Sequence, residues 1–174
     1  HLLFINLLTD SLPAIAIGVE PATGGLLDQK PRDPKEPILT KGLLGKIFAY
    51  GAIIAAAVMA AYFIGLRDSG AELAMTMAFS TLTLARLFHG FNCRGIPSIF
   101  RIGLTTNKAS IGAFFAGVVL LAAVLFIPGL NTLFEVAPFT MKEIGLVVLL
   151  AFLPTVVIQI YKVVGDAVRA SRRK

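Results

Sequence analysis

The sequence predicts an all-α integral membrane protein with five transmembrane helices. Of its 174 residues, 56% are hydrophobic and only 15% are charged, and the mean hydropathy is +0.82. A soluble domain has about a quarter of its residues charged, so this composition points away from a soluble fold. Apolar runs of about 17 to 25 residues, long enough to cross a bilayer as helices, recur along the chain. We therefore expect residues 1–174 to form one membrane domain with spans at about 2–18, 43–66, 72–92, 109–127 and 144–164.

The first span, residues 2–18, has polar groups in its interior. Asn6, Thr9 and Asp10 stand at positions i, i+3 and i+4, so they project from one helical face. Pro13 lacks an N–H, and the carbonyl of Thr9 therefore loses its helical partner. We expect the first span to be unwound near Asp10–Pro13, because irregular backbone at membrane depth survives where it is buried in protein or faces water.

This arrangement gathers one carboxylate, one amide oxygen, one hydroxyl and a freed carbonyl. Hard cations such as Ca²⁺ and Mg²⁺ prefer oxygen ligands, and Ca²⁺ takes about six to eight of them. Partner helices must therefore complete such a site. An acid inside a membrane indicates a functional site, for a cation or a proton. The alternative is that Asp10 sits near one membrane face while Asn6 makes an interhelical hydrogen bond.

The connection after the first span, residues 19–42, is polar and rich in proline. It is longer than a simple connector needs to be, which is typical of a loop with a function of its own. The second span, residues 43–66, is almost entirely alanine and aliphatic. Its small residues Gly51, Ala55 and Ala60 offer places where another helix could approach closely.

The third span, residues 72–92, contains Arg86 and, one turn later, His89. His89 could titrate near neutral pH, although a single histidine in a helix is more often a packed or interfacial residue. The fourth and fifth spans, residues 109–127 and 144–164, are mainly apolar. Gln159 in the last span is expected to make an interhelical hydrogen bond.

The distribution of Lys and Arg predicts the orientation of the spans in the membrane. Thirteen of the sixteen basic residues fall on one predicted side: five in the first loop, three in the third and five at the C-terminal end. That side should be cytoplasmic, and the C-terminus with it. The net charge of +6 therefore reflects this bias and requires no nucleic-acid partner. No phosphate loop, zinc-spaced Cys/His set or serine-hydrolase elbow occurs in the sequence.

At this point a resemblance appears. The stretch "LLFINLLTDSLPAIAIGVEP" closely resembles the sixth transmembrane helix of P-type cation-transporting ATPases of the calcium-pump branch, whose pattern there is N-x-x-T-D-x-x-P-A. The loop "KPRDPKEPIL" resembles the family's following cytoplasmic loop, and "TMAFSTLTLARLFHGFN" is similar to its eighth helix. The resemblance covers essentially the whole chain, as the sixth to tenth helices of these sarcoplasmic-reticulum-like pumps.

This resemblance implies the C-terminal transmembrane part of an ATP-driven pump that cycles through a phospho-aspartate. It implies that Asn6, Thr9 and Asp10 are cation ligands, with Ca²⁺ as the transported ion. It also implies that the loop at residues 19–42, with Arg32, Asp33 and Glu36, couples ATP hydrolysis to the ion site.

The chain itself lacks the family's phosphorylated D-K-T-G-T loop and its nucleotide domain, so it contains no catalytic residue and should hydrolyse nothing alone. ATP and Mg²⁺ would bind the missing cytoplasmic domains. The expected partners are these phosphorylation and nucleotide domains, the first five helices and the lipid membrane.

Arg86 departs from the family pattern, because it aligns with a glutamate in two-site calcium pumps. A guanidinium stays charged at any plausible pH, so it repels a cation and attracts Asp10. We therefore expect one cation per cycle, with Arg86 as a counter-charge when the site is empty. The alternative is that Arg86 extends towards the cytoplasmic interface.

Two other functions stay open from the sequence. The pump could carry a different cation, namely Na⁺, H⁺, Mn²⁺ or Mg²⁺, since all of these accept oxygen ligands. The chain could also be a self-standing membrane channel or anchor module. A D-K-T-G-T motif upstream in the parent reading frame would favour the pump, and a start codon shortly before His1 would favour the module.

Overall fold

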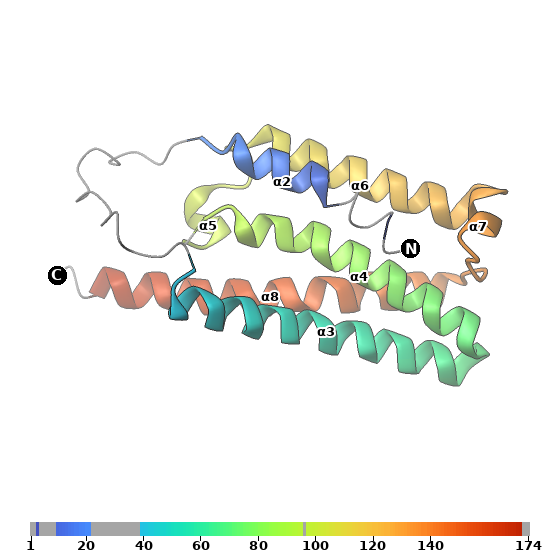
Figure 1. Ribbon diagram of the computed structural model, residues 1–174. Helices are drawn as coiled ribbons and strands as arrows, with labels where there is room; N and C mark the ends of the chain where they lie inside the picture. The colour runs from blue at the N-terminus through green and yellow to red at the C-terminus, as the bar shows by residue number, and fades with distance from the viewer. Residues whose placement is uncertain (1–2, 4–9, 22–38, 96, 172–174) are drawn as a thin grey trace.

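The computed structural model describes residues 3, 10–21, 39–95 and 97–171 (Figure 1). Their regular structure is helical, as the sequence predicts, and no strand occurs among them. The helices are α2 (Ser11–Gly18), α3 (Lys41–Ser69), α4 (Ala71–Cys93), α5 (Ile99–Ile102), α6 (Lys108–Phe126), α7 (Leu130–Leu133) and α8 (Met141–Ser171).

Three of these helices, α3, α6 and α8, are long and apolar enough to cross a membrane. They correspond to the second, fourth and fifth predicted spans, and both α3 and α8 extend beyond the predicted ends. The third predicted span corresponds to the 23-residue helix α4, which is less apolar. Of the first span the structure describes α2, which starts one residue after Asp10. The count of five crossings therefore stays a prediction. The unwinding expected near Asp10–Pro13 is wrong for Ser11–Pro13, which are helical, because Pro13 lies in the first turn of α2, where its missing N–H needs no helical partner.

Helix α4 lies at the centre of the bundle (Figure 1), where it contacts α2, α3, α6 and α8. Its buried side chains include Leu73, Met77 and Leu87, which are at most 3% exposed. It also buries hydroxyls, and two of them donate to carbonyls one turn back: Ser80 Oγ to Thr76 at 2.7 Å and Thr83 Oγ1 to Phe79 at 2.8 Å. These bonds satisfy polar groups that would otherwise be costly in an apolar interior.

Two glycines allow α4 to approach its neighbours closely. A Cβ added to Gly65 of α3 would lie 2.8 Å from the Cα of Ala74, and one added to Gly117 of α6 would collide with a methyl of Leu87. The turn between α3 and α4 passes through Gly70, whose φ of +89° favours glycine. By contrast, Gly51 has no described atom within 4 Å of an added Cβ, so the close approach expected there is not made within the described chain.

The helix ends divide between the two ends of the bundle. The end of α2, the start of α3, the α4–α6 connection and the end of α8 lie at one end, and the α3–α4 turn and α7 at the other (Figure 1). The described connections that carry most of the basic residues, which the sequence assigns to one side of the membrane, therefore lie at one end of the bundle. Two cap side chains fix helix starts there: Thr40 accepts from Leu43 N at 3.2 Å, and Asn107 accepts from Ser110 N at 3.0 Å.

We predict that Gly65→Ala destabilises the protein, because the new methyl meets backbone atoms that cannot rotate away. The expected loss is about 1–3 kcal/mol, the usual cost of overpacking. The midpoint of thermal unfolding in detergent measures it. Gly45→Ala in the same helix is the matched control, because its added methyl meets nothing within 4 Å. Equal midpoints for the two variants would contradict the close contact of α3 with α4.

Candidate cation site

The structure brings Asp10 and Arg86 together. Asp10 caps the start of α2, and its main-chain carbonyl accepts from Ala14 N at 3.1 Å, while its side chain makes no capping bond. That carboxylate instead forms an ion pair with the guanidinium of Arg86, which α4 holds between the buried residues Ala85 and Leu87. The contact joins Arg86 Nη2 to Asp10 Oδ2.

This pair is partly open. The side chain of Arg86 is 38% exposed and that of Asp10 is 28% exposed in the described chain. The arginine stays charged, so a cation that uses the Asp10 carboxylate must first displace the guanidinium. At equal distance a divalent cation attracts the carboxylate twice as strongly as the singly charged guanidinium does. The arrangement can therefore exchange one positive group for another on the same acid.

The other predicted site residues lie outside the described residues. These are the two proposed ligands Asn6 and Thr9 and the three loop residues Arg32, Asp33 and Glu36. Among the described residues there is no group of three or more His, Cys, Asp or Glu that could hold a metal ion. Asp10 is thus the one predicted ligand whose surroundings the structure describes.

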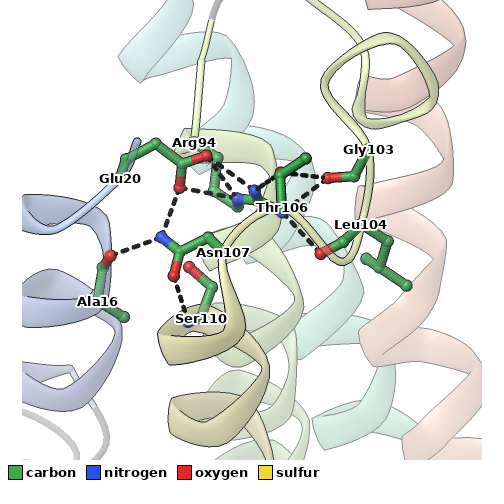
Figure 2. A network of polar contacts seen from close by, with 8 residues as sticks. All are labelled: Ala16, Glu20, Arg94, Gly103, Leu104, Thr106, Asn107 and Ser110. Atoms are coloured by element: carbon green, nitrogen blue, oxygen red, sulfur yellow. Dashed lines mark hydrogen bonds and ion pairs between the residues drawn. The ribbon is translucent and has the colours of Figure 1, made fainter. Parts of the chain in front are cut away.

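A second acid–arginine pair lies at the end of α2, where sequence reasoning had assigned no site. Arg94, directly after α4, has a side chain with no exposed surface, and Glu20 lies two residues after α2. Nε and Nη2 of Arg94 both bond the Glu20 carboxylate, the shortest at 2.8 Å (Figure 2). The remaining donors reach the carbonyls of Gly103 and Leu104 and the hydroxyl of Thr106.

Asn107 extends this network from α6 to α2 (Figure 2). Its amide nitrogen donates to Glu20 Oε2 at 2.6 Å and to the carbonyl of Ala16 at 2.8 Å, while its oxygen caps α6. The Ala16 carbonyl belongs to the last turn of α2, where helical partners run out. We call the side chains of Glu20, Arg94 and Asn107 the outer network. Its clearest sequence signal is the cap-type residue Asn107 just before an apolar run.

Glu20, which lies outside the predicted spans, has its pKa changed by the outer network. Hydrogen bonds from Arg94 hold the pKa of Glu20 below its usual value, with a smaller contribution from Asn107, although burial opposes the shift. The carboxylate is therefore kept ionised and paired next to the buried guanidinium.

A third polar cluster joins the end of α4 to α8. Lys162 donates to the carbonyls of Asn92 and, at 2.6 Å, Gly95, both near the C-terminal end of α4. Gln159 donates to Asn92 Oδ1 at 2.7 Å and accepts from Ile99 N at 3.0 Å, so the interhelical hydrogen bond expected of Gln159 is confirmed. His89 stacks edge-on with Tyr50 and contacts Asn92, as expected of a packed histidine.

An open groove of about 1200 Å³ runs between α3, α4 and α8. Its apolar wall includes Ile47, Gly51 and Ile54 of α3, and its polar wall includes Arg86, His89, Asn92 and Lys162. Polar and charged side chains at membrane depth usually face protein or water and not lipid. Through Arg86 this groove adjoins the pair with Asp10.

Comparison with known proteins gives a family match over most of the chain. A family model described as "Cation transporting ATPase, C-terminus" matches residues 1–164. The chain is 39% identical over 172 residues to a calcium-transporting ATPase of Listeria monocytogenes, a match that covers 95% of this chain and 19% of the relative. It is 34% identical over 157 residues to a calcium-transporting ATPase of Bacillus subtilis, with 89% of this chain and 18% of the relative covered.

A more distant similarity is to "calcium-transporting ATPase type 2C member 1" of Mus musculus, 29% identical over 146 residues. That match covers 83% of this chain and 16% of the relative. The chain thus spans about a fifth of the length of the bacterial relatives.

We predict that the contribution of Glu20 to stability depends on pH. Because its folded pKa is lowered, this contribution is fully present above the unfolded value of about 4.3 and is lost as pH falls through the folded pKa. The difference in thermal midpoint between wild type and Glu20→Gln should therefore be largest near neutral pH and shrink below pH of about 4.3. Glu72→Gln, which removes an exposed acid of α4, corrects for the lost charge. A difference that is constant from pH 7 to pH 3 would contradict the pairing.

Proposed function

The chain belongs to the family of P-type cation-transporting ATPases, whose C-terminal membrane region it matches, and from this membership we propose that it forms part of a calcium pump. The named relatives are calcium-transporting ATPases, and this supports Ca²⁺ as the transported ion. In the proposal the pump exports one Ca²⁺ per cycle, and ATP and Mg²⁺ bind cytoplasmic domains beyond this chain.

The observation that carries the proposal is the ion pair of Asp10 with Arg86. When the site is empty, Arg86 neutralises Asp10 and makes an unoccupied acid tolerable in the membrane. When Ca²⁺ enters, it takes the carboxylate from Arg86 and gains further oxygens from Asn6 and Thr9. The guanidinium stays close by and repels a second cation, which limits the site to one ion.

Further helices of the same pump complete the site. The chain spans about a fifth of the length of its bacterial relatives, and it leaves open both the Asp10–Arg86 pair and the groove beside it. A transmembrane helix from the preceding part of the pump fits this groove, because small residues on the α3 wall admit a close helix and such a helix would cover the polar wall from lipid. Carboxylates on such helices would balance the charge of the bound Ca²⁺.

The loop at residues 19–42 supplies the coupling in this proposal. Arg32, Asp33 and Glu36 contact the phosphorylation domain on the cytoplasmic side, where the C-terminus also lies. This orientation is supported by the basic residues that gather at one end of the bundle, among them Lys41, Arg101 and Lys108.

In the full-length protein, Asp10→Asn should abolish Ca²⁺-dependent phosphorylation by ATP. The amide keeps the size of the side chain but removes the charge that attracts the ion. Phosphoenzyme formation from labelled ATP across a Ca²⁺ titration measures this. Asp68→Asn is a control, since Asp68 is an acid at the far end of the bundle, where it forms an ion pair with Lys142 at 4.0 Å. Wild-type Ca²⁺ affinity in Asp10→Asn would remove Asp10 from the ligand set.

Replacing Arg86 by Gln should lower the Ca²⁺ concentration for half-maximal phosphorylation by about tenfold, equivalent to roughly 1.4 kcal/mol. The cation then no longer competes with a guanidinium for the Asp10 carboxylate. Dephosphorylation should slow at the same time, because the emptied site lacks its counter-charge. Arg86→Lys, which keeps the positive charge, should stay closer to wild type in both measurements. Unchanged Ca²⁺ affinity in Arg86→Gln would argue that Arg86 merely extends to the interface.

A further inference from the structure

Two acid–arginine pairs join the α2 segment to α4, and they follow the same order along both segments. Asp10 pairs with Arg86. Glu20, ten residues after Asp10, pairs with Arg94, eight residues after Arg86. The two segments therefore run in the same direction, as Figure 1 shows for α2 and α4. A shift of α2 along α4 would disturb both pairs together.

The two pairs differ in how firmly they are held. In the outer network every nitrogen of the Arg94 guanidinium has an acceptor, from Glu20, two backbone carbonyls and a hydroxyl. The Arg94 side chain is 0% exposed and that of Glu20 is 17% exposed, whereas the Arg86 and Asp10 side chains are 38% and 28% exposed. Charge-assisted, bidentate and buried bonds of this kind are the strong ones. The outer pair is thus more buried and more fully hydrogen-bonded than the inner pair.

From this contrast we propose that the outer network is a fixed anchor that sets the register of α2 against α4, so that Asp10 faces Arg86. Glu20, Arg94 and Asn107 are then positioning residues for the cation site, although they do not touch the ion. The inference rests on the proposed function, because the register matters through the competition between Arg86 and the cation. Asn107 strengthens the anchor by tying the last turn of α2 to the start of α6.

The anchor also occupies a mechanically useful place. Glu20 stands between Asp10 and the proposed coupling loop in the sequence. Arg86 lies in α4, and Arg94 is the residue that follows its last turn, about two turns further on. With the outer pair closed, the end of α2 cannot slide, and opening of the inner pair is confined to the side chains of Asp10 and Arg86.

A double-mutant cycle in the full-length pump tests this inference. The variants are Glu20→Gln, Arg86→Gln and the two combined, and the measured quantity is the Ca²⁺ concentration for half-maximal phosphorylation by ATP. Glu20→Gln alone should lower this concentration about threefold, because Arg86 then holds Asp10 less well. In the Arg86→Gln background Glu20→Gln should cause no further shift, since the competitor is already absent.

Controls separate positioning from folding. Glu20→Asp keeps the charge but shortens the side chain, so it should give a smaller shift of the same sign, and it serves if Glu20→Gln does not fold. Asp68→Asn, which alters an ion pair at the other end of the bundle, should leave the Ca²⁺ concentration unchanged in both backgrounds. A role in folding alone would lower the amount of active pump without moving the Ca²⁺ concentration.

Two results would overturn the anchor: the same shift of Glu20→Gln with and without Arg86, or no shift in either background. If wild-type phosphorylation proved independent of Ca²⁺, the proposed function would fail instead. The double-mutant cycle would then be measured through midpoints of thermal unfolding. Arg86→Gln should lower the midpoint less in the Glu20→Gln background than in the wild type. Additive midpoints would overturn the anchor on their own.

Discussion

Two acid–arginine ion pairs hold the α2 segment against α4, and the rest of the candidate site depends on them. Arg86 sits on the most central helix of the bundle and meets Asp10, while Arg94 at the end of the same helix meets Glu20. The glycines at positions 65 and 117 let α3 and α6 pack closely on α4. Packing and charge therefore converge on one helix, and the candidate site depends on where that helix holds its two arginines.

An acid that is neutralised by a tethered guanidinium differs from an acid shared among several ligands. The tethered charge can leave the carboxylate without leaving the protein, so binding of a cation becomes an exchange and not a simple addition. In the proposed cycle such an exchange has its own return step, because Arg86 would pair with the carboxylate again when the ion departs. The open groove that Arg86 lines offers space for the displaced guanidinium, beside the further pump helices that we propose to pack there.

Much of this could be predicted from the sequence, for clear physical reasons. The helical class follows from apolar runs. The attraction of Arg86 to Asp10 was expected from the resemblance to calcium pumps, which places Arg86 at a ligand position, together with their opposite charges. The outer network could not be predicted, because Glu20 and Arg94 are each an ordinary residue for a helix end, and nothing in the sequence marks them as partners. The short helices α5 and α7 could not be predicted either, because four residues are too few to show a helical hydrophobic periodicity. A close contact of α3 was expected at Gly51, but it is made at Gly65, because helix composition does not show which glycine faces a neighbouring helix.

The central claim is that Arg86 limits the site to one ion. Reconstituted vesicles that contain the full-length pump allow Ca²⁺ uptake and ATP hydrolysis to be measured together. We expect one Ca²⁺ to be transported for each ATP hydrolysed. Two Ca²⁺ per ATP would contradict it, because a second cation could not bind beside a guanidinium that stays charged and close by.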